Sequence, residues 1–209
     1  GKVEQSLSFF KSAVAADPKI EQFWLSYVDA LLKIDRFDDA KQLLEKASAS
    51  GISENILINL QEKLNASDNK NVSLRSSLQE LLELYNKGDH ETALSKGMIL
   101  AQRSPNDPNL LNILGAIYAA LEKHDEAIRQ YQKAIKLNPT NAEFHNNLGA
   151  TFRKASKNNK AIKEYKTAIR LRPDFASAHN NLANIFLSSD NFEQSAFNFM
   201  KALLINPSY

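Results

Sequence analysis

The side chains with the clearest chemical potential lie in a short stretch, His-Asn-Asn-Leu, that occurs twice, at His145–Leu148 and His179–Leu182. An imidazole can bind a metal ion or move a proton, and an asparagine amide offers one acceptor and two donors. If the two histidines hold the same position on equivalent helices, they stand ~10 Å or more apart, because directly packed helices are already 8–10 Å apart. A shared zinc ion needs bonds of ~2.0–2.1 Å. We therefore interpret both histidines as packing residues and predict no metal site.

Other catalytic arrangements are missing from the sequence. It has no phosphate-binding glycine loop, no HExxH zinc helix, no GxSxG elbow and no GxGxxG turn. The carboxylate pairs Asp38–Asp39 and Asp125–Glu126 fall at the start of expected helices, where negative charge complements the helix dipole. We predict no catalytic residue and no cofactor, and hence no enzyme activity in this chain itself. A catalytic domain elsewhere in a longer parent protein remains an alternative.

The composition narrows the class of partner. The 209 residues include 26 Lys and Arg against 24 Asp and Glu, a net charge of +2 that is too balanced for a typical nucleic-acid binder. There is no cysteine, which excludes disulfides and cysteine-ligated zinc. No apolar run approaches the ~20 residues that cross a bilayer. The first residues lack the shape of a signal peptide, so we expect a cytoplasmic location and neither nucleic acid nor membrane as partner.

Prolines mark the elements that must position these side chains. They recur every 34 residues, and helices end at or before such prolines. A fixed period of this length indicates a repeat array, in which each repeat holds two helical patterns. Large residues such as Tyr131 and Tyr165 recur with small residues such as Gly115 and Gly149, which predicts close approach of neighbouring helices. The recurring prolines are Pro105, Pro139, Pro173 and Pro207.

The run LNILGAIYAA…EAIRQYQKAIKLNP, from Leu111 to Pro139, resembles the tetratricopeptide repeat. The resemblance implies an all-α fold, a right-handed superhelical solenoid of antiparallel helix pairs with about twelve helices. It also implies that the first helix of each pair lines a concave binding surface.

The repeat pattern divides the chain into three parts. Residues 1–54 read as half a repeat plus one repeat, and residues 74–209 read as four consecutive repeats. Between them, residues 55–73 fall outside the period. Their first part, NILINLQEKL, predicts an amphipathic helix, and their second part, NASDNKNVS, is rich in Asn, Ser and Asp and predicts a polar loop. If that loop is flexible, it acts as a hinge.

The first helices leave one stripe for the concave surface, and asparagines gather on it. The windows from Ala142 and Ala176 resemble the array of O-linked N-acetylglucosamine transferases, in which an asparagine ladder grips the substrate main chain. That resemblance implies ladder positions at Asn147 and Asn181. In the alternative interpretation, the asparagines cap or bridge between adjacent first helices and bind nothing. The candidate groove residues are Asn112, Asn146, Asn147, Asn180, Asn181, Asn184, Arg153 and Lys154.

Basic residues are densest in the window from Ala142. They are interpreted as the solvated face of one repeat, or alternatively as a patch for an acidic partner. The residues concerned are Arg153, Lys154, Lys157, Lys160, Lys163, Lys166, Arg170 and Arg172.

These observations favour a protein–protein interaction scaffold that binds an extended peptide or partner segment in its groove. One alternative is the substrate-recognition arm of a larger enzyme, such as a glycosyltransferase, whose catalytic domain lies outside this chain. Another is self-assembly into a homo-oligomer, because both terminal repeats expose apolar side chains instead of a polar cap.

Overall fold

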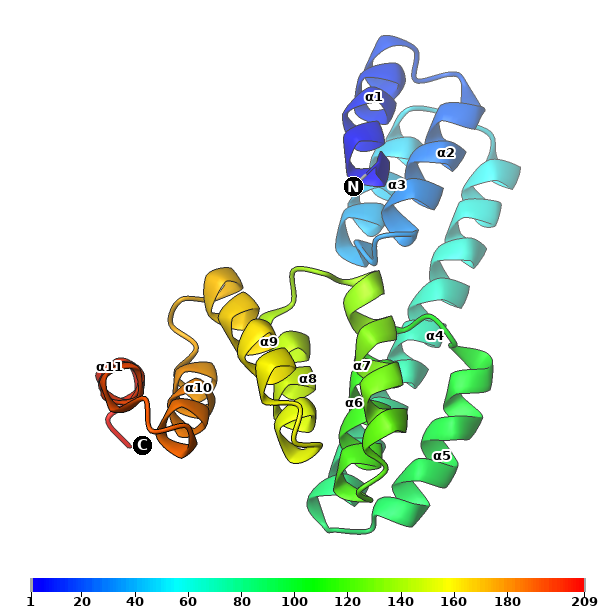
Figure 1. Ribbon diagram of the computed structural model, residues 1–209. Helices are drawn as coiled ribbons and strands as arrows, with labels where there is room; N and C mark the ends of the chain where they lie inside the picture. The colour runs from blue at the N-terminus through cyan, green and yellow to red at the C-terminus, as the bar shows by residue number, and fades with distance from the viewer. Residues whose placement is uncertain (1, 209) are drawn as a thin grey trace. The chain divides into compact units, whose positions relative to one another are not determined.

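The computed structural model describes residues 2–208, and every regular element in that range is a helix (Figure 1). The predicted all-α fold is confirmed. The eleven helices of this range are α1 (Lys2–Ala16), α2 (Glu21–Leu32), α3 (Phe37–Ala49), α4 (Glu54–Asn86), α5 (His90–Arg103), α6 (Pro108–Ala120), α7 (His124–Leu137), α8 (Ala142–Lys154), α9 (Asn158–Leu171), α10 (Ala176–Ser188) and α11 (Phe192–Ile205). The chain divides into two compact units, Gly1–Ser76 and Ser77–Tyr209, which we call unit 1 and unit 2.

Unit 1 consists of α1, α2, α3 and the first part of α4. Its core is built around Trp24, which is 2% exposed and packs with Val28, Leu60 and other apolar side chains. The Trp24 indole also donates a hydrogen bond of 2.8 Å to the carbonyl oxygen of Pro18, six residues earlier. This bond ties the start of α2 to the turn between α1 and α2.

The predicted polar loop is wrong, because residues 65–73 lie inside α4, a single helix of 33 residues. The stretch contains neither glycine nor proline. Asn, Ser and Asp each cost a helix less than ~0.7 kcal/mol. Some of that cost is offset by side-chain contacts, including an ion pair of 3.0 Å between Lys41 and Asp68. The predicted extra helix and the first helix of the next repeat therefore merge, which gives eleven helices where about twelve were predicted.

Unit 2 follows the solenoid pattern that the period predicts. Each first helix packs on its own second helix and on the second helix of the preceding pair: α6 contacts α7 and α5, α8 contacts α9 and α7, and α10 contacts α11 and α9 (Figure 1). The close approach at glycine is confirmed as well. A Cβ atom at Gly115 would lie 2.7 Å from the Tyr131 ring, and one at Gly149 would lie 2.8 Å from the Tyr165 ring.

The turns between the two helices of a pair share one unusual backbone position. Gly88 has a φ of 80°, and the residues 34 and 68 positions later, Glu122 and Ser156, have φ of 60° and 58°. This left-handed conformation closes the preceding helix: the N–H of Lys123 donates to the carbonyl of Tyr118 at 2.9 Å. A residue with a Cβ atom is strained there by roughly 1–2 kcal/mol, whereas glycine is not.

We therefore expect Glu122→Gly to raise the free energy of unfolding of unit 2 by up to about 1 kcal/mol, because it removes that strain. Glycine already occupies the equivalent position of the preceding repeat, at Gly88. Urea denaturation followed by circular dichroism measures the change. The matched control is Gln132→Gly at an exposed position within α7, which should lower stability by about 1 kcal/mol. A loss of stability in Glu122→Gly would contradict the strain argument.

No helix in residues 2–208 combines the length and the apolar character that crossing a membrane requires.

Candidate functional site

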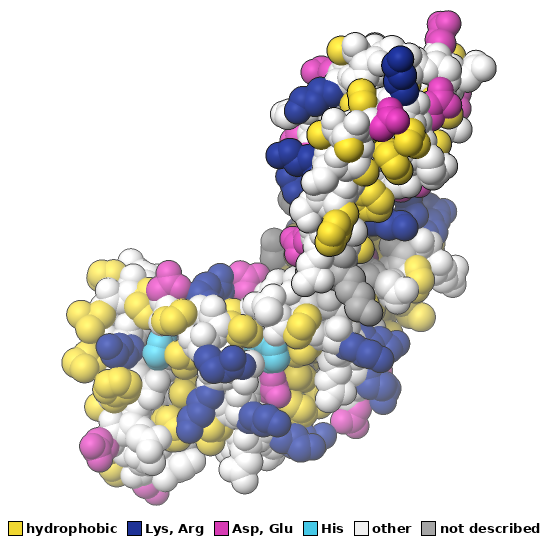
Figure 2. Space-filling view, turned by 90° about the horizontal axis from the view of Figure 1, so that it is seen from above, with side chains coloured by type: hydrophobic (Ala, Val, Ile, Leu, Met, Phe, Trp, Pro, Cys, Tyr) yellow, Lys and Arg dark blue, Asp and Glu magenta, His cyan; other side chains and the backbone are white. Residues whose placement is uncertain are grey.

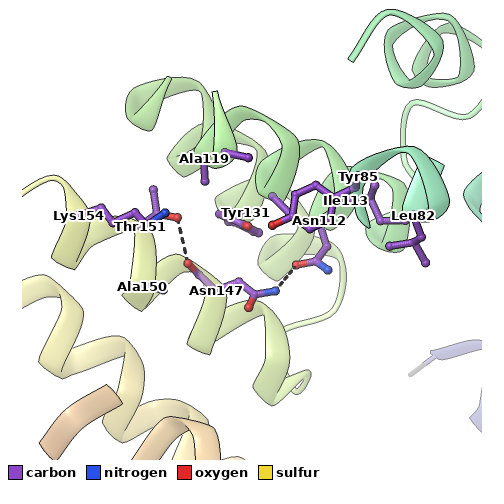
Figure 3. Close-up of a pocket in the computed structure, with 12 residues that line it drawn as sticks. Leu82, Tyr85, Asn112, Ile113, Ala119, Tyr131, Asn147, Ala150, Thr151 and Lys154 are labelled. Carbon is purple, nitrogen blue, oxygen red and sulfur yellow. Dashed lines mark hydrogen bonds between the residues drawn. The ribbon is translucent and has the colours of Figure 1, made fainter. Parts of the chain in front are cut away.

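A hollow of about 420 Å³ opens in unit 2 between the first helices of successive pairs (Figure 3). Such a volume falls in the range of small-ligand pockets, and it accommodates a few side chains of a peptide. Its lining comes from four helices. The lining residues are Leu82 and Tyr85 of α4, Asn112, Ile113, Ala116, Ala119 and Ala120 of α6, Tyr131 of α7, and Asn147, Ala150, Thr151 and Lys154 of α8.

The hollow exists because the lining side chains are small. Alanine occupies four of its positions, including Ala116 and Ala119 on α6 and Ala150 on α8. The apolar side chains of Leu82, Tyr85 and Ile113 complete a surface that would gain free energy by contact with an apolar group. The site is thus an open apolar hollow with polar groups at defined points.

Two asparagines join the helices across this hollow. The Asn147 amide of α8 donates a hydrogen bond of 3.0 Å to Oδ1 of Asn112 on α6 (Figure 3). The same geometry recurs one repeat later, where the Asn181 amide of α10 donates to Oδ1 of Asn146 on α8 at 3.1 Å. The asparagines therefore bridge adjacent first helices, as one of the two interpretations expects.

The bridge leaves hydrogen-bonding capacity in the hollow. It uses one N–H of Asn147 and one acceptor site of Asn112. An amide carries two N–H donors and a carbonyl oxygen. Within residues 2–208, the second N–H and Oδ1 of Asn147 and both N–H groups of Asn112 have no other assigned partner. These groups match the donors and acceptors of a peptide main chain.

Of the eight predicted groove residues, Asn112, Asn147 and Lys154 line the hollow. The other five are placed elsewhere. Asn146, at 9% exposure, is buried in its bridge to Asn181. Asn184 donates to the backbone carbonyl of Asn180 at 2.9 Å, and Arg153 has an exposed side chain. The eight residues therefore do not form one continuous row in a single hollow.

Sequence reasoning missed Leu82, Tyr85 and the part played by Tyr131. Leu82 and Tyr85 lie 34 residues before Ala116 and Ala119. The positions that face the groove on α6 therefore predict Leu82 and Tyr85 when they are shifted back by one repeat. The recurrence of Tyr131 with small residues predicts only a packing role. It is 3% exposed and still contributes to the wall of the hollow.

Burial keeps the hydroxyl groups of Tyr131 and Tyr165 neutral. Burial raises the pKa of the Tyr131 hydroxyl well above its ordinary value, and the nearby Tyr85 adds to that effect. Burial likewise raises the pKa of Tyr165 to about 12, although the charge of Arg153 acts in the opposite direction. Neither hydroxyl is suited to transfer a proton near neutral pH. Residues 3–208 contain no group of three or more His, Asp or Glu side chains placed to hold a metal ion.

The two repeated histidines hold the repeats in register. Nδ1 of His145 lies 2.7 Å from the Glu164 carboxylate, and Nε2 lies 3.2 Å from the carbonyl oxygen of Pro139. His179 has the same two contacts, with Nδ1 3.1 Å from Oδ1 of Asn198 and Nε2 3.1 Å from the Pro173 carbonyl. The bond from a ring nitrogen to a proline carbonyl six residues earlier also occurs at Trp24.

The environment of His145 favours its protonated form. The hydrogen bond to Glu164 raises the pKa of the His145 imidazole above its ordinary 6.5, against the opposing effect of burial, and the bond to Pro139 raises it further. The folded state therefore binds this proton more tightly than the unfolded state does.

A pH dependence of stability follows from that shift. The contribution of His145 is fully present below pH 6.5 and is lost as pH rises through the raised pKa of the folded state. We expect Glu164→Asn, which copies the His179–Asn198 pair, to flatten the decline of unfolding free energy between pH ~5.5 and ~8.5. Urea denaturation at several pH values measures both slopes, and equal slopes would refute this role of Glu164.

A stack of helix pairs whose first helices border an open apolar hollow defines a helical-repeat solenoid of the protein-interaction class. A sequence model described as "TPR repeat" matches residues 115–155 and 151–190. Models described as "Tetratricopeptide repeat" match residues 1–51 and 176–209. The chain belongs to the tetratricopeptide repeat family. The predicted family is thereby confirmed.

Solved structures share the fold. A MamA segment from Desulfovibrio magneticus RS-1 is 17% identical with a TM-score of 0.59 and covers 83% of this chain and 97% of its own. The Cut9–Hcn1 hetero-tetramer of the APC/C is 18% identical with a TM-score of 0.59 and covers 100% of this chain and 38% of its own. The O-GlcNAc transferase of Thermobaculum terrenum, in a mutant form, is 23% identical with a TM-score of 0.53. It covers 55% of this chain and 22% of its own. No curated protein sequence matches the chain.

Proposed function

We propose that the chain is a protein-interaction scaffold whose unit 2 binds an extended segment of a partner protein in the hollow between α6 and α8. The observation that best supports this proposal is that the Asn112–Asn147 amide pair lies in the lining of an apolar, alanine-rich hollow. The apolar surface receives one or two apolar side chains of the partner. The spare amide groups bind its main chain, so that the position of the segment is fixed with little demand on its other side chains.

The charge at the rim adds a preference. Lys154 lines the hollow and its side chain is exposed, so it favours an acidic residue next to the apolar anchor. The Cut9–Hcn1 structure is that of a hetero-tetramer, which supports a role in complex formation for solenoids of this kind.

Ala119→Arg tests the proposal. Ala119 corresponds to Arg153 in the next repeat, so the register accepts arginine there, and the longer side chain fills the hollow. Peptides selected on the wild-type chain from a displayed random library serve as probes. We expect Ala119→Arg to weaken their binding ~10-fold or more, measured by fluorescence anisotropy. The control is Lys133→Ala, an exposed position of α7 outside the hollow, which should bind as the wild type does. Peptides that bind Ala119→Arg with unchanged affinity would contradict the proposal.

A second variant separates the two roles of the asparagines. Replacing Asn112 and Asn147 together with alanine removes the bridge and the spare amide groups but keeps the hollow. The lost bond should cost about 0.5–1.5 kcal/mol of stability. We expect binding of the selected peptides to fall as well. A lower melting temperature with unchanged binding would show that the amides only bridge the helices.

A further inference from the structure

The outer face of α11 departs from its own repeat register. Phe197 occupies the position of Arg129 and Lys163 in the two preceding second helices. Two further positions on the same helix show the same change from polar to apolar. The corresponding sets are Arg129, Gln132 and Lys136 on α7, Lys163, Lys166 and Arg170 on α9, and Phe197, Met200 and Leu204 on α11. We call the last three residues the α11 patch.

These positions point to solvent throughout the array. On α7 and α9 the corresponding side chains are exposed even though a further helix pair packs on each of those helices. Another helix pair stacked on α11 in the same way would therefore leave the α11 patch uncovered. Packing between successive repeats does not account for its apolar character.

The α11 patch is a continuous apolar stripe. Its residues have the spacing i, i+3 and i+7, which places them on one face of the helix. Phe197 is 52% exposed, Met200 52% and Leu204 72%. Exposed apolar residues that cluster in this way mark interaction sites in soluble proteins.

Positive side chains occur on α11 itself and on the preceding second helix, α9. The ammonium group of Lys201 lies 5.6 Å from the centre of the Phe197 ring, and α11 carries one acidic side chain, Glu193. On α9, which packs on the other side of α10, Lys163, Lys166 and Arg170 are exposed. Those three side chains form no ion pair within residues 3–208. Figure 2 shows hydrophobic side chains gathered at the α11 end of unit 2 and Lys and Arg side chains over the part next to it.

We propose that the α11 patch and the basic face of α9 together dock an acidic amphipathic helix of a partner protein. Its apolar side chains cover Phe197, Met200 and Leu204. Its Asp or Glu side chains meet Lys163, Lys166 and Arg170. This second surface lies on the second helices, whereas the hollow between α6 and α8 is bordered mainly by first helices, so the two sites have separate residues and separate ligands.

The test exchanges the patch for the residues that α9 carries at the same positions. The variant Phe197→Lys, Met200→Lys, Leu204→Arg is expected to fold as the wild type does, because those residues are already exposed on α9. The probe is a synthetic amphipathic helix with leucine on one face and glutamate on the other, labelled for fluorescence anisotropy. We expect the variant to bind it ~10-fold more weakly or worse.

A charge variant tests the basic half without altering the patch. Lys163→Glu, Lys166→Glu, Arg170→Glu should also weaken binding of the glutamate helix ~10-fold, since each contact becomes repulsive. A probe with lysine in place of glutamate should bind the wild type ~10-fold more weakly. Ala119→Arg, which blocks the hollow, should bind the glutamate helix with unchanged affinity, and this outcome separates the two sites.

Four results would overturn the proposal. The first is unchanged binding in the patch variant, and the second is equal binding of the lysine and glutamate helices. The third is a dimer in sedimentation velocity that the patch variant abolishes, which would make a second copy of the chain the occupant. The fourth is that the wild type binds phosphatidylserine vesicles but not the glutamate helix, and that the patch variant loses this vesicle binding.

Discussion

Replacing Tyr165 with alanine is expected to lower the free energy of unfolding of unit 2 by about 3–5 kcal/mol, the usual range for truncating a buried aromatic residue. Tyr165 is 0% exposed and packs in one cluster with Phe152, Leu182 and other apolar residues. Its ring also fills the space over Gly149, where even a methyl group would lie 2.8 Å away. The loss therefore removes contacts within the α8–α9 pair and with the following first helix.

Tyr165→Phe is the matched control. The Tyr165 hydroxyl is buried and has no hydrogen-bond partner among residues 3–208, and Phe199 occupies the same register position in the next repeat. Removing an unpaired buried hydroxyl should leave stability unchanged or raise it by about 1 kcal/mol. Urea denaturation followed by circular dichroism compares both variants. A loss below ~1 kcal/mol in Tyr165→Ala would mean that the site collapses around the cavity.

Replacing Trp24 with alanine is expected to destabilise unit 1 by a similar amount, about 3–5 kcal/mol. Trp24 is 2% exposed at the centre of the unit 1 core, and its indole N–H binds the Pro18 carbonyl. The variant thus loses both a large buried ring and the bond that holds the start of α2. Because Trp24 is the one tryptophan of the sequence, its fluorescence reports unit 1 alone in the wild type.

Trp24→Phe separates packing from hydrogen bonding. It keeps an aromatic ring but leaves the Pro18 carbonyl without its donor, which should cost about 1–3 kcal/mol. Amide hydrogen exchange of α2 in both variants gives the measurement, since it does not need the indole. If Trp24→Phe were as unstable as Trp24→Ala, the hydrogen bond rather than the ring would dominate the core.

Much of the fold could be predicted from the spacing of a few residue types. The 34-residue proline period predicts where each pair of helices ends, and the recurrence of small residues beside large ones predicts close approach of neighbouring helices. The structure shows such an approach between Gly149 and Tyr165. These signals are reliable because they arise from steric exclusion that repeats identically. The polar loop could not be predicted correctly, because Asn and Ser disfavour a helix only weakly and no glycine or proline interrupts α4.

The candidate site could be predicted less completely. Helical periodicity brought Asn112, Asn147 and Lys154 to one face, and all three line the hollow. Periodicity does not determine rotamers, so it could not decide whether the amides of Asn147 and Asn181 reach towards a ligand or towards the neighbouring helix. The depth of the hollow depends on four alanines and on the placement of the Tyr131 ring, and such dimensions arise only from packing in three dimensions.

The length of α4 has a consequence for local opening. Between Leu64 and Leu81 the described part of the chain has no fully buried residue, and most side chains of that stretch are exposed. Its amide protons should exchange with solvent faster than those at either end of the same helix. A protease that needs a briefly unwound segment would cut there first and release two fragments, each of which retains its own buried cluster.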